Sequence, residues 1–242
     1  MKSVILILIL LISSVLPAFG QHSMNADLDY VTRYMWRGFD VLDDRTAIQP
    51  SITYSHDGGF SVNVWTSFGL CDRNEVNDLD EVDVTFSYSK PINDIFSVEA
   101  GLVNYLYPVM DDFPDDNSMS QEIFFTVSAA YSIGSPYLSV YYDFNLGDGL
   151  FIQAGYSREF ELNEDLKPVF SVDLGYNNGS WGVQDMGLSN LDAGLTLPVN
   201  FDKFSLGFGL YSVFILNDEL RDMNRGESTE LWGKISLSYS FN

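Results

Sequence analysis

Cysteine, histidine and basic residues are scarce in this chain of 242 residues. Cys71 is the only cysteine, which excludes an internal disulfide and a metal cage built from thiolates. His22 and His56 are the only histidines, which removes most histidine-dependent catalysis and most zinc sites. Twelve Lys and Arg stand against 34 Asp and Glu, a formal charge of −22. This balance argues against nucleic acid as a partner, because binding to phosphates needs clustered basic residues.

Long apolar runs are absent except at the N-terminus. Residues 4–12 are wholly apolar, Lys2 precedes them, and Ser13 and Pro17 interrupt the run before it reaches the roughly 20 residues that span a bilayer. Small residues at 18 and 20 complete the layout of a secretory signal peptide cleaved before Gln21. We therefore expect a signal peptide over residues 1–20 and one domain over residues 21–242.

What the chain has in abundance is alternation. In residues 229–241 and 121–133, apolar and polar side chains take turns, which is the period of a β-strand. We count about twelve such segments, each close to the 9 to 11 residues of a tilted transmembrane strand. Their expected spans are 27–37, 47–55, 60–70, 81–90, 95–107, 121–133, 137–146, 149–160, 168–178, 189–199, 203–216 and 229–241.

The connections between these segments alternate in length as well. Tight turns are expected at 56–59, 91–94, 134–135, 161–167 and 200–202, with longer, acidic loops at 38–46, 71–80, 108–120, 179–188 and 217–228. Short turns on one side and long loops on the other are typical of outer-membrane barrels, in which the short turns are periplasmic. The tight turn at 147–149 breaks this pattern. The sequence thus predicts an all-β fold, an antiparallel transmembrane β-barrel of about twelve strands.

A soluble β-sandwich is the alternative fold, since its strands also alternate. Here, however, the polar faces are rich in Ser, Thr, Asn and Gly, and aromatic residues make up 15% of the chain. Interfacial girdles account for this aromatic content better than a soluble core does. Expected girdle residues are Tyr54, Phe60, Tyr88, Phe96, Tyr131, Phe170, Phe204 and Tyr239 at the periplasmic rim, and Trp36, Phe68, Phe144, Tyr176 and Phe214 at the other rim.

The last segment resembles the terminal strand that the outer-membrane assembly machinery reads. Lys234 is polar, Ser236 is small, and Tyr239 and Phe241 are aromatic, although Asn242 follows the final aromatic residue. An ordinary last strand is the alternative. We expect the assembly machinery, through Phe241, and outer-membrane lipid to be partners of this chain.

Residues 27–128 carry a resemblance to a family. The segments LDYVTRYMWRGFDV, AIQPSITY, GGFSVNVWTS, LDEVDVTFSYS, GLVNYLYP and SQEIFFTVS resemble the TorF family of Gram-negative porins. The matching positions are Tyr34, Arg37, Gly38, Gln49, Trp65, Glu81, Tyr105, Tyr107, Pro108 and Glu122, with departures at Pro50 and Asn63. The resemblance implies an outer-membrane barrel of porin type in a Gram-negative bacterium, with an unknown substrate.

If the apolar faces point to lipid, charged residues of the strands face the lumen, where they meet water or each other. The candidates for lining or narrowing a pore are Arg33, Arg37, Asp83, Glu99, Glu122, Asp143, Asp173 and Asp192. One interpretation is an acidic, cation-favouring diffusion pore for small solutes, with Arg33 and Arg37 in a constriction. The other is a narrow barrel filled by paired charges, for example Arg37 with Glu99 or Glu122.

Three further interpretations concern the loops and the chemistry. The acidic loops are mostly a solvated surface, although carboxylates at this density can also hold Ca²⁺ or Mg²⁺. A non-conducting barrel whose loops bind a surface, divalent cations or a partner is the alternative function. No enzymatic activity is expected, because both histidines fall on the periplasmic side. No catalytic residue, metal site or cofactor is expected, and the oligomeric state, including a homo-oligomer, is left open.

Overall fold

A computed structural model describes residues 22–70, 79–108, 118–163 and 166–241. The expected signal peptide therefore lies outside the described residues, as do most of the acidic loops at 71–80 and 108–120. Within the described part of the chain, no helix is long and apolar enough to cross a membrane.

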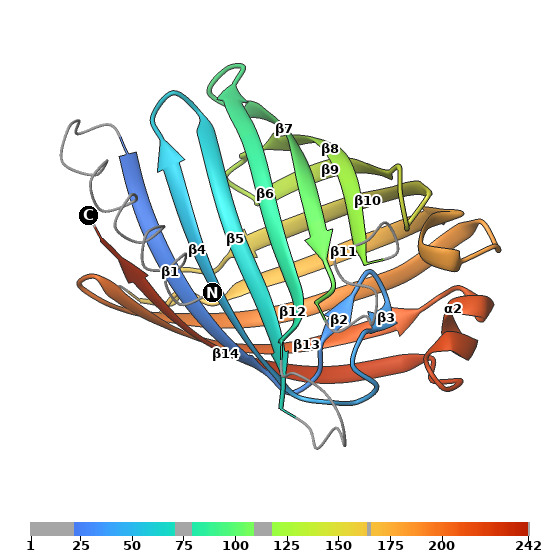
Figure 1. The fold of residues 1–242 in the computed structure, drawn as a ribbon. Helices are drawn as coiled ribbons and strands as arrows, with labels where there is room; N and C mark the ends of the chain where they lie inside the picture. The colour runs from blue at the N-terminus through green and yellow to red at the C-terminus, as the bar shows by residue number, and fades with distance from the viewer. Residues whose placement is uncertain (1–21, 71–78, 109–117, 164–165, 242) are drawn as a thin grey trace, which may run out of the picture.

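The described residues form a closed barrel of twelve antiparallel strands, as predicted. Each strand pairs with its neighbours in the chain, and β1 closes the circle against β14, so that the first and last strands lie side by side (Figure 1). The barrel strands are β1 His22–Val31, β4 Ala47–His56, β5 Phe60–Gly69, β6 Leu79–Pro91, β7 Phe96–Leu106, β8 Met119–Ala129, β9 Ser135–Asp143, β10 Gly149–Glu159, β11 Val169–Asn178, β12 Gly187–Phe201, β13 Phe204–Ile215 and β14 Thr229–Ser240.

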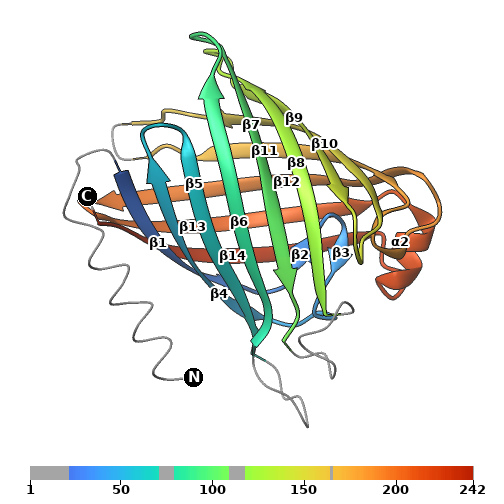
Figure 2. The same ribbon diagram turned by 45° about the horizontal axis from the view of Figure 1, so that its top comes forward.

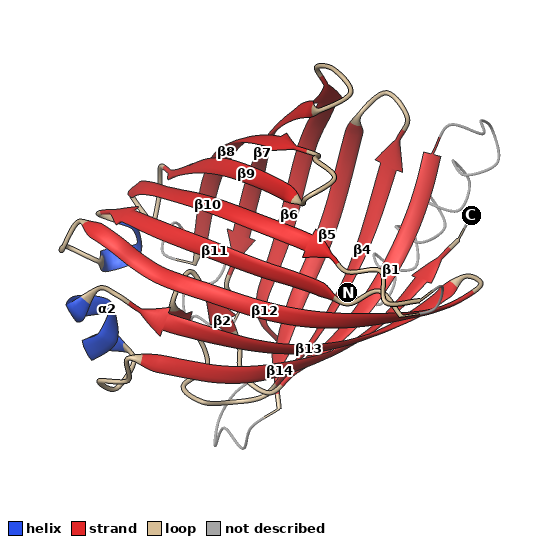
Figure 3. Ribbon diagram, turned by 180° about the vertical axis from the view of Figure 1, so that it is seen from behind, coloured by secondary structure: helices blue, strands red, loops and turns tan. Residues whose placement is uncertain are grey.

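The remaining elements all belong to the connections at one rim. A short hairpin, β2 Met35–Trp36 and β3 Phe39–Asp40, lies between β1 and β4. The 3-10 turn η1 Ser180–Gly182 follows β11, and the helix α2 Asp218–Met223 follows β13. Figure 3 shows both helical elements at the same end of the barrel. The opposite rim carries the short turns, where His22 of β1 is paired with His56 of β4.

The side chains follow the alternation that the sequence predicts. On β8, Ile123, Phe125 and Val127 are exposed on the outside, whereas Glu122 is buried inside the barrel. Exposed aromatic residues recur at the short-turn rim, among them Phe60, whose ring is tilted against that of Tyr88, and Phe204, whose ring is tilted against that of Tyr239. An apolar outer face with a polar interior is the arrangement of a barrel that lies in lipid.

Two expectations about the first strand are wrong. The strand expected at 27–37 is β1 His22–Val31, and the chain then leaves the wall. The physical reason is a two-residue turn at Arg37 and Gly38, both with positive φ (50° and 88°), which reverses the chain between Trp36 and Phe39. Trp36 consequently does not belong to the outer girdle. Its ring packs instead among Phe39, Tyr105 and Trp181 inside the barrel.

Candidate functional site

The β2–β3 hairpin lies inside the barrel, near the rim of long loops (Figure 2). Its tip carries Arg37 and Gly38. The two φ angles there suit glycine, and at Gly38 an added Cβ would meet Leu220 Cδ2 at 2.8 Å and Asn190 Cβ at 3.0 Å. The turn therefore needs glycine at residue 38 both for its backbone conformation and for its fit between β12 and α2.

Arg37 anchors the tip of the hairpin to the barrel wall. Its Nη1 and Nη2 donate to the two carboxylate oxygens of Glu122 at 2.7 and 2.8 Å, and Tyr105 Oη donates to the same carboxylate at 3.0 Å. The guanidinium also lies over the rings of Tyr141 and Phe151, at 4.3 and 4.7 Å from their centroids. Of the two pairings expected for Arg37, the structure has the one with Glu122.

Arg37 keeps its charge although it is buried. Burial by itself lowers the pKa of Arg37, but the hydrogen bonds and the charge of Glu122 outweigh that effect, so that the pKa of the guanidinium lies above its ordinary value. The bidentate geometry and the flanking aromatic faces are those in which an arginine pair is strongest. The hairpin tip is thus fixed by a charged contact that is shielded from solvent.

The loop that contains α2 holds the other side of the hairpin. Asn224 Nδ2 donates to the carbonyl of Gly38 at 2.5 Å, and Asn224 Oδ1 accepts from the backbone N–H of Asp40 at 3.0 Å. Leu220 of α2 is completely buried, against a cluster that includes Val183 and Phe39. Three connections, 32–46, 179–186 and 216–228, are therefore joined into one assembly at this rim.

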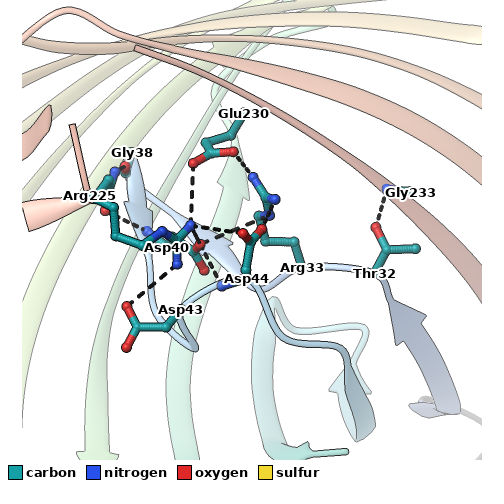
Figure 4. Close-up of polar contacts among 10 residues, drawn as sticks. Thr32, Arg33, Gly38, Asp40, Asp43, Asp44, Arg225, Glu230 and Gly233 are labelled. Carbon is teal, nitrogen blue, oxygen red and sulfur yellow. Dashed lines mark hydrogen bonds and ion pairs between the residues drawn. The ribbon is translucent and has the colours of Figure 1, made fainter. Parts of the chain in front are cut away.

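An ion-pair network lies beside the hairpin, as Figure 4 shows. Arg33 pairs with Asp44 and Glu230. Arg225 reaches the same acids, with its Nη2 at 2.8 Å from Asp40 Oδ2 and 3.4 Å from Asp44 Oδ2. Four carboxylates, those of Asp40, Asp43, Asp44 and Glu230, thus share two arginines and are only partly neutralised. Among the described residues, no group of three or more His, Cys, Asp or Glu is arranged to hold a metal ion.

Tyr34 and Trp36 of the hairpin segment line two cavities. The outer cavity, of about 410 Å³, is bounded by the long-loop rim and includes Glu81, Tyr107 and Trp181. The inner cavity, of about 500 Å³, is lined farther down the strands, where Asp83 and Asp192 face into it. The hairpin therefore separates the loop side of the lumen from its strand-lined interior.

Several lumen carboxylates have no basic partner. Among the described residues, no ion pair joins a basic side chain to Glu81, Asp83, Asp173 or Asp192, whereas Lys234 is paired with Asp29 at 3.3 Å. β6 and β12 are six strands apart in either direction around the barrel, so that Asp83 and Asp192 lie on opposite walls of the inner cavity. Asp173 is adjacent to Asp192 across the β11–β12 pair.

The other predicted residues have different surroundings. Asp143 is fully buried and accepts hydrogen bonds from Ser120 Oγ and from the backbone N–H of Asn145 and Gly147, so it stabilises the turn after β9. Glu99 lies on the face of β7 that also carries Val103 of the inner cavity, nearer the short-turn rim. The structure brings Arg37, Asp83, Glu122 and Asp192 together around one cavity.

Four residues that line this site or hold the hairpin were not predicted in these roles: Glu81, Tyr34, Trp181 and Asn224. Glu81 had a signal, because it shares a strand face with Asp83 two residues away. Its carboxylate accepts from Tyr34 Oη at 3.1 Å. Burial, together with the charges of Glu81 and Asp83, raises the pKa of Tyr34 well above its ordinary value. Trp181 and Asn224 lie in loops, where no periodicity marks a side chain that points inward.

Residues 17–205 match a bacterial family described as a protein of unknown function, Gcw_chp. The chain belongs to this family. No curated protein matches it. The match spans the barrel from β1 to the start of β13, and therefore includes the hairpin and every carboxylate that faces the two cavities.

Solved structures share the barrel of this Gcw_chp protein. The KdgM porin is similar with a TM-score of 0.59 and 13% identity, over 90% of this chain and 99% of the porin. A second KdgM structure, in complex with disordered oligogalacturonate, has a TM-score of 0.60 at 13% identity, over 90% and 99% of the two chains. LpxR from Salmonella typhimurium has a TM-score of 0.56 and 10% identity, over 89% of this chain and 99% of LpxR. At such identities the likeness concerns the fold alone.

Proposed function

We propose that this Gcw_chp protein is an outer-membrane channel for small solutes whose lumen favours cations. The observation that carries the proposal is the pair Asp83 and Asp192, which face each other across the inner cavity with no basic partner among the described residues. By contrast, Arg33, Arg37 and Lys234 are each paired with carboxylates. Negative charge in a lumen attracts cations and repels anions.

The β2–β3 hairpin forms the narrow part of this channel. Arg37 holds its tip against Glu122 on β8, and Arg33 holds its base against Glu230 on β14. A channel so narrowed passes small solutes and excludes large ones. The two arginines thus act in the constriction without adding uncompensated positive charge to it.

An acidic lumen suits different solutes from those of a porin crystallised with oligogalacturonate, which is a polyanion. Carboxylates at Asp83, Asp173 and Asp192 would repel such a chain. We infer that the solutes of this protein are neutral or cationic.

The membrane setting follows from the outer surface. The exposed apolar side chains lie on the outside of the strands, and aromatic residues gather at the short-turn rim. We infer a Gram-negative outer membrane, export through the signal peptide over residues 1–20, and recognition of the last strand by the assembly machinery through Phe241. Within this setting the chain is proposed to be a porin of the TorF type.

We also propose that the barrel is not an enzyme, although LpxR, which has the same fold, is one. Both histidines lie at the short-turn rim, where His22 faces His56. The outer cavity lies at the opposite rim, and neither histidine lines either cavity. A histidine base would be needed there for hydrolysis of a lipid at the outer rim.

Single-channel recording in a planar bilayer tests the proposal. The refolded protein, its folding verified by heat-modifiable gel mobility, is placed in a salt gradient at pH 8. We expect reproducible conductance steps and a reversal potential of the sign that marks cation selectivity. In Asp83→Asn/Asp192→Asn the steps should persist while the selectivity falls towards that of free diffusion.

The matched control is Asp57→Asn/Asp94→Asn, which removes two exposed carboxylates from the short turns and should leave the selectivity nearly unchanged. Anion selectivity of the wild-type protein would refute the cation-favouring lumen. A folded protein that gives no steps would refute the channel, and would favour the alternative of a non-conducting barrel whose acidic loops bind a surface, divalent cations or a partner.

A further inference from the structure

We propose that the outer cavity is a binding site for a small organic ammonium ion. The inference rests on the proposed channel and names the class of solute that enters it. The cavity lies on the loop side of the hairpin, where a solute arriving from outside the cell would be met first. Its volume of about 410 Å³ lies within the roughly 300–1,000 Å³ range of small-molecule sites.

Five of the eleven residues that line the cavity are aromatic: Tyr34, Trp36, Phe39, Tyr107 and Trp181. Trp181 stands nearly perpendicular to Trp36 and to Tyr107, with interplanar angles of 89° and 82°, so that ring faces and edges meet around the space. Ring faces attract cations through their quadrupole, and indole does so most strongly. The same cluster already holds one cation, since the Arg37 guanidinium lies 4.5 Å from the centroid of Trp36.

Carboxyl groups supply the charge. Glu81 is 6% exposed, lines the cavity and has no basic partner among the described residues; its hydrogen-bond partners are the side chains of Tyr34, Tyr107 and Asp83. Asp40 also lines the cavity, and its Oδ1 is buried without a hydrogen-bond partner in the described residues, while its Oδ2 is shared with Arg225. A buried carboxylate oxygen without a partner is uncommon, and a bound donor or cation would satisfy it.

This combination selects one ligand chemistry. An anion would face Glu81 and Asp40 without a free basic group to balance it. An inorganic cation would leave the apolar part of the wall, which includes five aromatic residues, without contacts to carbon atoms. An ammonium ion with methyl or methylene groups uses both features, because its charge meets the carboxylates and its carbon atoms meet the rings.

Tryptophan fluorescence tests the site, since Trp36 and Trp181 both line it. The folded protein in detergent is titrated with choline and, separately, with 3,3-dimethylbutan-1-ol, which has the same shape without the charge. We expect a saturable change with choline and at least about tenfold weaker binding of the neutral alcohol. The variants are Glu81→Gln and Trp181→Leu, with Glu227→Gln, an exposed acid of the same rim, as the control.

Glu81→Gln and Trp181→Leu should each weaken choline binding by about tenfold, whereas Glu227→Gln should bind like the wild type. Equal binding of choline and the alcohol, or no saturable change with choline, would overturn the inference. Binding is read from fluorescence and conduction from the bilayer. Conduction without choline binding would thus overturn the ammonium site alone, and choline binding in a protein that does not conduct would refute the channel while keeping the site.

Discussion

The Arg37→Met substitution is expected to release the β2–β3 hairpin from the barrel wall and to widen the channel. Methionine keeps an unbranched apolar side chain near the rings of Tyr141 and Phe151, but it removes both hydrogen bonds to Glu122. Among the described residues, the Glu122 carboxylate, 1% exposed, then retains only the hydroxyl of Tyr105 as a side-chain donor. The substitution therefore leaves a buried charge without its counter-ion.

The magnitude follows from that loss. Breaking a buried ion pair by removing one partner costs about 3–5 kcal/mol, because the remaining charge is not solvated. A change of about 3 kcal/mol lowers the ratio of docked to undocked hairpin about 150-fold. Removing both charges in Arg37→Met/Glu122→Gln avoids the unpaired charge. The double variant should therefore be more stable than the sum of the two single variants predicts, by about 2–3 kcal/mol.

A double-mutant cycle on the free energy of unfolding measures this coupling, with urea as denaturant and the barrel in phospholipid vesicles. The exposed pair Lys167 and Glu161, whose Nζ and Oε1 are 3.0 Å apart, is the control, and its coupling should stay below about 1 kcal/mol. Single-channel steps of Arg37→Met should be larger than those of the wild type. A coupling no larger than that of the control pair, together with unchanged conductance, would refute the role of Arg37 as the anchor of the hairpin.

Three further predictions concern the same hairpin. Asn224→Ala removes the two hydrogen bonds to Gly38 and Asp40 and should destabilise the docked hairpin by about 1–3 kcal/mol. The loss is measured as faster amide exchange over residues 35–40, and unchanged exchange would contradict the role of Asn224 in holding the hairpin. Gly38→Ala places a Cβ 2.8 Å from Leu220 at a φ of 88° and should lower the free energy of unfolding by about 1–2 kcal/mol. Gly226→Ala is the control, because Gly226 also has a positive φ but lies in open space, so that this variant reports the backbone strain alone. Burial raises the pKa of Tyr34 above its ordinary value of 10.0, so the unfolded chain loses that proton at a lower pH than the folded chain does. The contribution of Tyr34 to the free energy of unfolding should therefore be constant below pH 10 and decline above it. Tyr34→Phe should lessen the alkaline decline, and an identical decline in both proteins would contradict the buried phenol.

The strands were predictable because their environment is the same along the whole chain. Every strand has one face against lipid and one against the lumen, so the pattern of β8, apolar at Ile123 and Phe125 and polar between them, recurs without interruption. The lengths of the connections then fixed which rim carries the loops. Boundaries held closely where a turn residue ends the strand, as at Gly59, whose φ is 96°.

The candidate site was predictable only in part. Alternation placed Asp83, Glu122 and Asp192 on inward faces, and a charge inside a barrel needs water or a partner, which made Arg37 with Glu122 an expected pair. The hairpin escaped prediction because its turn is Arg37-Gly38, whereas the usual signal is asparagine or aspartate before glycine. Trp36 was assigned to the girdle for the same reason, since it continues the alternation of a strand that has already ended.

The sequence by itself determined the class of the protein: an acidic, aromatic-rich chain of alternating strands with lipid outside and polar groups within. Those properties are local, because each depends on residues two positions apart or on composition. Only the tertiary structure decided that residues 32–46 turn inward, that Asn224 and Glu122 hold the hairpin from two sides, and that rings of three different segments surround Glu81. These contacts join residues up to 186 positions apart, and nothing in the pattern of either segment specifies which distant side chain it will meet.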